Sequence, residues 1–385
     1  MPNLNLKTIA CVATALIISG CQKPATETPA PSASQTPSET SEAPEPAEPV
    51  EATPAEDPEV VASIERVATS IKKDSNGYVT EVNYRGSSVS DDDLETLTKL
   101  TKLQSILLNE AKISDNGLKQ IGKIKTLRNL DLRDCPISNE GLAHLVNLDG
   151  LRALRLSGKS GVTDVDDDGM VHVGKLTSMK ALLLDFLWVS GEGLSQLGEL
   201  KNLEELYLAG TLVGDEDLAQ MSLFPNLKKL RLSKLSQVTG AGLEHVSQLS
   251  KLEDLDLSED SSLFDADLAP IANMTTLKRL NLWRVALTND GVAHLQKLTN
   301  LNWLNLDNTQ LSDAGLVYLK GMNQLTFLHL GSTAITNDGL PELAGLKSLK
   351  DLKITRTAVT EEGVEKLKKE LPKTEIQLKY LGDGE

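Results

Sequence analysis

The chain has 385 residues, of which 55 are acidic and 39 are Lys or Arg, so its formal net charge is −16. This balance argues against nucleic-acid binding, because phosphate contacts require clustered Lys and Arg. Hydrophobic residues make up 40% of the chain but aromatic residues only 3%, and leucine dominates. Length alone would suit two or three globular domains.

Residues 1–20 are predicted to be a signal peptide. An apolar run from Ile9 to Ile18 is too short to span a bilayer comfortably. It ends in Ile-Ser-Gly-Cys21, which resembles the lipobox of bacterial lipoproteins; an ordinary secretory signal is the alternative. The resemblance implies cleavage before Cys21, lipid on its thiol and anchoring to a membrane of the cell envelope. Because Gln22 is not the aspartate that often retains such proteins at the inner membrane, we expect the outer membrane.

Residues 21–58 are expected to combine the lipidated cysteine with a disordered tether. The segment is rich in Pro, Ala, Thr, Ser and Glu and lacks aromatic residues, so it cannot bury enough surface to fold. Its prolines and acids favour extended conformations. With Cys11 cleaved off and Cys21 lipidated, Cys135 stays alone, and we expect no disulfide within the folded part.

Residues 59–78 are predicted to form a helix and a turn that cap the folded domain. Asp57-Pro58 is a typical helix start, with a capping acid before proline at the first helical position. Apolar residues then recur at helical spacing as far as Ile71. The pattern predicts a helix from Glu59 to Lys73 and a turn at Asn76-Gly77.

Residues 79–374 contain twelve copies of one unit, illustrated by Leu301 to Gln324. Each copy reads as a short strand (LxxLxL), a tight loop and a helical return (GLxxLxx). The spacing is 24 residues except after Leu151, Leu227 and Leu252. The units begin at Val79, Leu103, Leu127, Leu151, Met179, Leu203, Leu227, Leu252, Leu277, Leu301, Leu325 and Leu349. Residues 375–385 are expected to add a closing strand and a tail.

The consensus LxxLxLxxTxITDxGLxxLxxLxx resembles bacterial leucine-rich repeats close to the cysteine-containing subtype, which also occurs in F-box proteins. The ninth position is Thr in four units and Cys135 in one. The resemblance implies an α/β fold, a right-handed leucine-rich-repeat solenoid shaped like a horseshoe, with a parallel inner sheet and outer helices. It also implies a binding role, without identifying the partner.

Acidic residues recur at the predicted helix starts, where Ser or Thr precedes Asp in Ser90-Asp91, Ser312-Asp313 and Thr163-Asp164, among others. We interpret the hydroxyl as a helix cap and the carboxylate as a favourable charge at the helix N-terminus. In the long fourth unit, Asp164, Asp166 and Asp168 have the spacing of a calcium loop. The twelfth loop position is Lys175 instead of Glu, so we favour a solvated bulge and expect no metal or cofactor.

Side chains at the third, fifth and seventh positions of each unit should face the concave surface, because the leucines at the fourth and sixth positions point inward. Three successive units place aromatic and polar residues there, and aromatic residues often dominate binding energy. These candidates are Arg279, Asn281, Trp283, Trp303, Asn305, Asp307, Phe327 and His329. Arg279, Trp303 and Phe327 should form one lateral row, in which the guanidinium can stack on the indole.

Two other surface features are weaker, one on the concave face and one on the loop edge. Lys229 and Arg231 are expected to pair with Asp254 and Asp256 of the next unit. Loop residues Phe186 and Trp188, beside the acidic bulge, form a possible secondary patch. The alternative to a binding row is that the concave aromatics only pack on one another and stiffen the sheet.

The sequence thus favours a membrane-anchored, non-enzymatic, monomeric leucine-rich-repeat protein that binds an unknown protein or glycan through its concave face. One alternative is a structural envelope scaffold or self-associating protein. A second is an enzyme of unrecognised type, although GxSxG, HExxH, CxxC and GxGxxG motifs are absent from the sequence.

Overall fold

The computed structural model describes residues 56–379. The predicted signal peptide, Cys21, nearly all of the tether and the last six residues of the chain lie outside the described residues. Within 56–379, no helix is long and apolar enough to cross a membrane.

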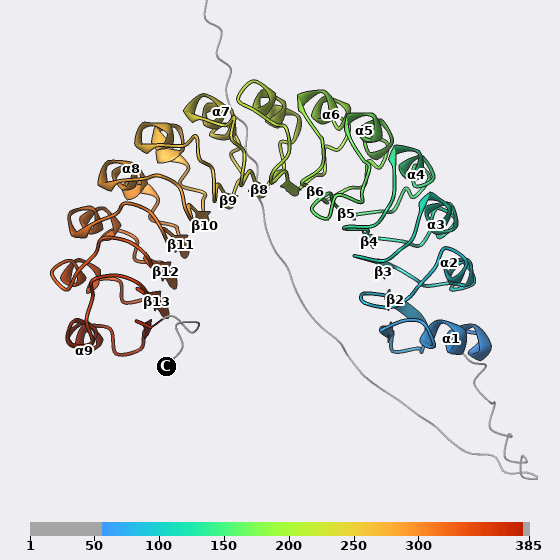
Figure 1. The fold of residues 1–385 in the computed structure, drawn as a ribbon, viewed down its shortest axis with the longest axis horizontal. Helices are drawn as coiled ribbons and strands as arrows, with labels where there is room; N and C mark the ends of the chain where they lie inside the picture. The colour runs from blue at the N-terminus through green and yellow to red at the C-terminus, as the bar shows by residue number, and fades with distance from the viewer. Residues whose placement is uncertain (1–55, 380–385) are drawn as a thin grey trace, which may run out of the picture. The chain divides into compact units, whose positions relative to one another are not determined.

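The described residues form one curved, 14-stranded sheet whose strand order follows the chain. All neighbouring strands are parallel except β1 and β2, which are antiparallel. Figure 1 shows the strands along the inner side of the arc and the helices along its outer side. The strands are β1 Ser70–Lys73, β2 Val79–Asn83, β3 Ser105–Leu107, β4 Asn129–Asp131, β5 Ala153–Ser157, β6 Ala181–Asp185, β7 Glu205–Tyr207, β8 Lys229–Arg231, β9 Asp254–Asp256, β10 Arg279–Asn281, β11 Trp303–Asn305, β12 Phe327–His329, β13 Asp351–Lys353 and β14 Glu375–Gln377.

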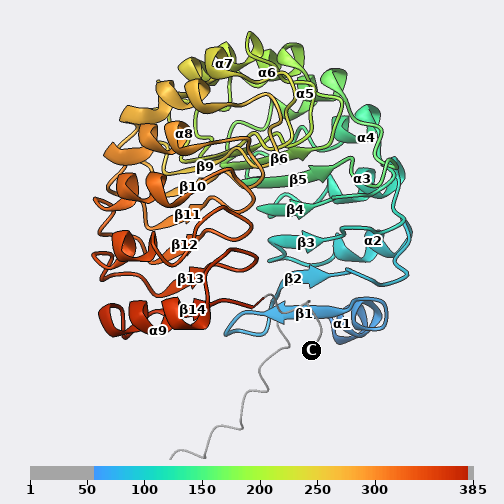
Figure 2. The same cartoon turned by 60° about the vertical axis from the view of Figure 1, so that its left-hand side comes forward.

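Short helices return the chain along the outer side, and several are 3-10 rather than α-helical. Seen from the side, they lie beside the ends of the strands they connect (Figure 2). The α-helices are α1 Pro58–Glu65, α2 Asp93–Leu97, α3 Asp115–Ile121, α4 Asn139–Ala143, α5 Asp167–Val173, α6 Gly191–Gln196, α7 Gly240–Val246, α8 Asn289–Ala293 and α9 Glu361–Glu370. The 3-10 helices are η1 Asp217–Leu223, η2 Asp265–Asn273, η3 His294–Lys297, η4 Asp313–Leu319 and η5 Leu340–Leu343.

The core lies between the sheet and the outer helices and consists mainly of the repeated leucines. In the tenth unit, Leu301, Leu304 and Leu306 are fully buried, whereas the residues between them are partly exposed on the concave side. Each unit therefore buries its apolar face only against its neighbours, as expected for a solenoid. The predicted right-handed solenoid with an inner parallel sheet is confirmed.

The tight turn after each strand has a regular backbone conformation. In eleven of the twelve units the eighth position lies in the left-handed region, and nine of these residues are not glycine. One is Phe186, with φ of 61°. The cost of this conformation for a residue with a Cβ atom must be offset by the hydrogen bonds that the turn makes with the next unit.

The predicted N-terminal helix from Glu59 to Lys73 is too long. Helix α1 ends at Glu65, and Ser70–Lys73 instead forms β1, which pairs with β2. A parallel solenoid would otherwise leave the outer edge of β2 with unpaired backbone groups. Strand β1 satisfies them and adds an ion pair of 2.7 Å between Lys72 and Glu81. The helical periodicity is overridden by this requirement for backbone pairing.

Candidate binding surface on the concave face

An aromatic column runs across four neighbouring strands on the concave face. The Arg279 guanidinium lies 4.4 Å from the centre of the Trp303 ring. On the other side of that ring, Phe327 stacks at 5.0 Å between centroids with an interplanar angle of 5°. Lys353 Nζ lies 5.5 Å from the centre of the Phe327 ring. The predicted row of Arg279, Trp303 and Phe327 is thus assembled, and Lys353, which sequence reasoning missed, extends it.

A polar row lies beside this column, because Asn281, Asn305 and His329 are paired laterally in the sheet. Each asparagine side-chain oxygen accepts a hydrogen bond from the backbone N–H two residues later, at 3.3 Å for Asn281 and 2.9 Å for Asn305. These bonds orient the side-chain NH2 groups. Burial lowers the pKa of His329, which favours its neutral form, although Asp307 lies 3.9 Å away.

The remaining candidates, Trp283 and Asp307, occupy the seventh position of their units. Trp283 is partly buried, and the Arg284 guanidinium lies 5.5 Å from the centre of its ring. Asp307 is also partly buried and faces His329. All eight predicted concave residues therefore belong to one continuous surface over β10, β11 and β12.

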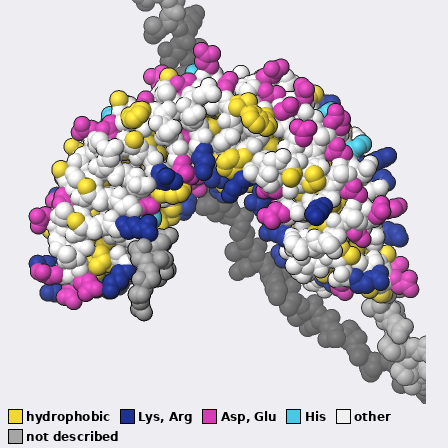
Figure 3. Space-filling model, viewed as in Figure 1, with side chains coloured by type: hydrophobic (Ala, Val, Ile, Leu, Met, Phe, Trp, Pro, Cys, Tyr) yellow, Lys and Arg dark blue, Asp and Glu magenta, His cyan; other side chains and the backbone are white. Residues whose placement is uncertain are grey.

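A polar hollow of about 220 Å³ adjoins the column and extends toward the middle of the sheet. Its lining is formed by Tyr207, Lys229, Leu230, Arg231, Asp254, Asp256, Arg279, Asn281 and Trp303. Basic side chains border the inner curve of the molecule, whereas acidic side chains are numerous around its outer rim (Figure 3).

The predicted ion pairs in this hollow are partly wrong. Arg231 contacts Asp256 at 3.3 Å as expected, but Lys229 pairs with Glu205 at 2.7 Å, and Asp254 pairs instead with Arg279 at 3.1 Å. Burial raises the pKa of Asp254 despite this pairing. The strand register alone did not predict these partners, because a long Lys or Arg side chain can reach an acid on either neighbouring strand.

The two residues of the predicted secondary patch have different environments. The Phe186 ring packs against Gly210, where an added Cβ would collide with it. The Trp188 side chain is 68% exposed, and the Trp188 backbone forms an isolated parallel β-bridge with Asp166 of the acidic bulge. Leu212, at the same position of the next unit, is also exposed. Phe186 is therefore a packing residue, and the exposed apolar surface at the loop edge is formed by Trp188 and Leu212.

Asp166, the middle acid of the calcium-like segment, links two units, because its side chain accepts a hydrogen bond from Asn139 Nδ2 of the preceding unit. Asp166 caps α5, because its side chain accepts a hydrogen bond from the Asp168 backbone N–H. The helix start expected at Thr163-Asp164 is therefore wrong, since Thr163 is buried and donates to carbonyl oxygens of Cys135 and Ser157. Among residues 56–379, no group of three or more His, Cys, Asp or Glu side chains could hold a metal ion.

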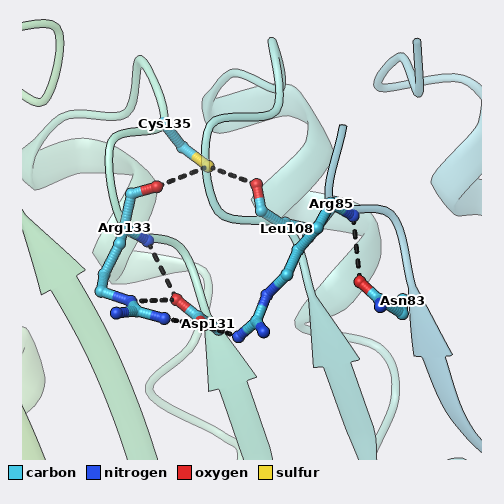
Figure 4. A network of polar contacts seen from close by, with 6 residues as sticks. All are labelled: Asn83, Arg85, Leu108, Asp131, Arg133 and Cys135. Atoms are coloured by element: carbon cyan, nitrogen blue, oxygen red, sulfur yellow. Dashed lines mark hydrogen bonds and ion pairs between the residues drawn. The ribbon is translucent and has the colours of Figure 1, made fainter. Parts of the chain in front are cut away.

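Sequence reasoning also missed a charged network near the N-terminal end of the concave face (Figure 4). Asp131, with no exposed surface, binds both Arg85 and Arg133 at 2.7 Å. The only sequence signal was the occurrence of arginines and an acid at concave positions of the first and third units.

Comparisons with known proteins agree with this fold. A family model described as a leucine-rich repeat matches residues 123–146. Among solved structures, an internalin (inlF) from Listeria monocytogenes has a TM-score of 0.53 and 20% sequence identity, covering 83% of this chain and 92% of that chain. No curated protein matches. The described residues thus have an internalin-like leucine-rich-repeat solenoid fold.

Proposed function

We propose that this protein is a non-enzymatic recognition module of the cell envelope that binds a protein partner through its concave face. The observation that carries the proposal is the column of Arg279, Trp303, Phe327 and Lys353, whose rings are held in fixed positions on an exposed sheet. Aromatic and arginine side chains that are already ordered lose little entropy on binding.

The arrangement of the rings favours a protein partner over a glycan. A sugar that binds by stacking needs a free aromatic face. Both faces of Trp303 are covered, one by Arg279 and the other by Phe327, and Lys353 lies over the second face of Phe327. The column therefore presents ring edges and cationic groups, which suit the mixed apolar and polar surface of a protein.

Affinity capture from envelope extract tests this proposal. The full-length protein is compared with a Trp303→Ala, Phe327→Ala variant and with Trp188→Ala as a matched aromatic control at the loop edge. We expect one protein to be retained by the wild type and the control and lost from the double variant, at equal melting temperatures. Retention by all three proteins would place binding elsewhere. Retention of a glycan through the column would overturn the preference for a protein partner.

The membrane anchor is part of the same proposal. The tetrapeptide that ends at Cys21 supports a lipidated N-terminus, and the following segment supports a tether that holds the solenoid away from the membrane. Cys21→Ser is expected to release the protein from the membrane fraction of a bacterial host. An unchanged distribution between membrane and soluble fractions would refute the lipid anchor.

Self-association is the second candidate function. It is favoured by the exposed Trp188 and Leu212 side chains, at 68% and 44% exposure, in equivalent positions of neighbouring units. Sedimentation velocity over a hundredfold concentration range tests it. A constant monomer mass would exclude this candidate, whereas a mass that rises with concentration and is restored to that of a monomer by Trp188→Ala would support it.

A further inference from the structure

A buried carboxylate orients two guanidinium groups at the N-terminal end of the concave face. Asp131 Oδ2 accepts hydrogen bonds from Arg85 Nη2 and Arg133 Nη2, each at 2.7 Å, and Oδ1 accepts one from Arg133 Nε at 2.9 Å. Burial alone would raise the pKa of Asp131. The hydrogen bonds and positive charge of the two arginines outweigh this effect, so the pKa lies below its usual range. Both arginines stay partly exposed, at 43% and 39% of their side-chain surface. Each guanidinium keeps N–H groups that Asp131 does not use.

A third arginine lies beside this pair. Arg155 in β5 is the direct lateral neighbour of Asp131 in β4. Within residues 56–379 its side chain makes no hydrogen bond or ion pair, although it is partly buried. Its guanidinium is therefore available to a ligand without breaking a contact in the protein.

The charge of this region is opposite to that of the whole chain. Concave positions of the first four units carry three arginines, Arg85, Arg133 and Arg155, against two carboxylates, Asp131 and Glu81. Glu81 is already paired with Lys72. The local excess of positive charge occurs in a protein of net charge −16.

The middle of the same face has the reverse arrangement. There, one guanidinium lies between two acids, since Arg231 contacts Asp185 at 2.9 Å and Asp256 at 3.3 Å. The surplus of guanidinium groups is thus confined to the N-terminal units. A ligand that crosses the concave face would therefore meet more guanidinium groups than carboxylates at the N-terminal end, but not in the middle.

We propose that Arg85, Arg133 and Arg155 form a binding site for the carboxylate side chains of an acidic segment in a protein partner. This site rests on the protein-binding role proposed above and adds a second contact region to the aromatic column. Guanidinium groups match carboxylates geometrically and form charge-assisted hydrogen bonds with them. Asp131 fixes two of the three groups before the ligand arrives, which reduces the entropy lost on binding.

Carboxylate fits better than phosphate for two reasons. Arg133 already uses its Nε and Nη2 groups on Asp131, and Arg85 uses one N–H of Nη2, so both have fewer N–H groups left for the three oxygens of a phosphate. Asp134 and Asp185 also lie close enough to Arg133 to act on it electrostatically. Their negative charge repels a doubly charged phosphate more than a singly charged carboxylate.

Fluorescence anisotropy with a labelled hexaglutamate peptide at low ionic strength tests the site, with hexaglutamine as the neutral control. In the full-length protein, Arg155→Gln removes a positive charge without removing any hydrogen bond of Asp131. Arg85→Gln removes one hydrogen bond of Asp131 but keeps those that Arg133 donates to it. Lys119→Gln, on the outer helix α3, removes the same charge from the opposite side. We expect each arginine variant to weaken hexaglutamate binding at least about tenfold, and Lys119→Gln to change it less than about twofold.

Equal weakening by Lys119→Gln would show a general charge effect and overturn the site. So would the absence of hexaglutamate binding by the wild type, or tighter binding of a phosphoserine peptide of equal charge. Trp303→Ala distinguishes this proposal from the aromatic column. If Trp303→Ala abolishes partner capture while hexaglutamate binding is unchanged, the arginine site is independent of the column, as we expect. Loss of hexaglutamate binding in Trp303→Ala would contradict that independence.

Discussion

Asp313 of the tenth unit accepts two hydrogen bonds from Thr336 of the eleventh, one from its backbone N–H and one from its hydroxyl, each at 2.7 Å. The carboxylate expected to favour the start of its own helix thus also links neighbouring units. The same paired contact occurs in Asp91–Ser114, Asp115–Ser138, Asp167–Ser190, Asp215–Thr239 and Asp265–Thr288. Where the acid is replaced by an amide, as in Asn337–Thr360, the amide accepts from the N–H and donates to the hydroxyl.

Replacing Asp313 with alanine should therefore destabilise the solenoid. The loss leaves the partly buried N–H and hydroxyl of Thr336 without their acceptor, at a cost of about 1–3 kcal/mol. Asp313→Asn should cost less, because Asn337 makes the equivalent contacts in the next unit. The urea midpoint measures both changes, with the exposed Asp338→Ala as control. Equal losses for Asp313→Ala and Asp313→Asn would contradict this account.

A glycine three residues after the linked hydroxyl residue makes room for the carboxylate. A Cβ added at Gly339 would collide with Asp313 Oδ1. Two units have neither a linking acid nor a linking amide, and carry Gly191 or Gly240 at that position. In each following unit the usual glycine is replaced by an aspartate, Asp217 or Asp267, which accepts a hydrogen bond from the backbone N–H three residues earlier. Aspartate and glycine thus exchange positions across the junction.

This exchange predicts a rescue between two substitutions. Gly191→Asp alone should destabilise the protein by about 2 kcal/mol, because its side chain would collide with Asp217. Adding Asp217→Gly should recover most of that loss, since the introduced carboxylate can then accept a hydrogen bond from the Gly214 N–H as the linking acids do elsewhere, although Gly214 has no hydroxyl to donate. A double-mutant cycle of unfolding free energies measures the coupling. If the changes in unfolding free energy of the two single variants simply add in the double variant, the proposed coupling between these positions would be ruled out.

The repeat positions were predictable because a solenoid depends mainly on contacts between adjacent units. The leucines fixed the strand register, and alternation along each strand placed Trp303 and Phe327 on the concave side. The arginine cluster was not predictable in this way. Arg85 reaches Asp131 across 46 residues and past an intervening strand, so its partner depends on the length and direction of the side chain. Strand β1 was not predicted because its residues have helical periodicity, whereas the backbone groups at the outer edge of β2 require a pairing strand.

The left-handed turn at the eighth position predicts a stabilising substitution at Ser332, which has φ of 52°. Glycine adopts this conformation without the steric cost of a Cβ atom, so Ser332→Gly should stabilise by about 0.5–1 kcal/mol. Ser332→Val should destabilise, because a β-branched residue is strained there. Thermal unfolding of both variants measures the difference. A midpoint that falls with glycine would show that the serine side chain makes a compensating contribution.

Asp260 should make stability depend on pH, because it is a fully buried acid without a basic partner among the described residues. Its Oδ1 accepts a hydrogen bond from the Leu235 N–H at 2.6 Å, whereas Oδ2 has no partner. Burial raises the pKa of Asp260 from 3.8 to about 8. A raised pKa means that the folded state binds the proton more tightly than the unfolded state. The stabilisation is therefore complete below about pH 4 and is lost as the pH rises through about 8.

The free energy of unfolding of the wild type should fall between pH 5 and pH 8, by at most roughly 4 kcal/mol. Asp260→Asn keeps the acceptor for Leu235 but cannot ionise, so it should remove most of this slope and be the more stable protein at pH 8. Urea unfolding at several pH values measures the effect, with Asp290→Asn, an exposed acid on α8, as control. Parallel pH profiles for wild type and Asp260→Asn would show that the Asp260 carboxyl does not titrate between the two states.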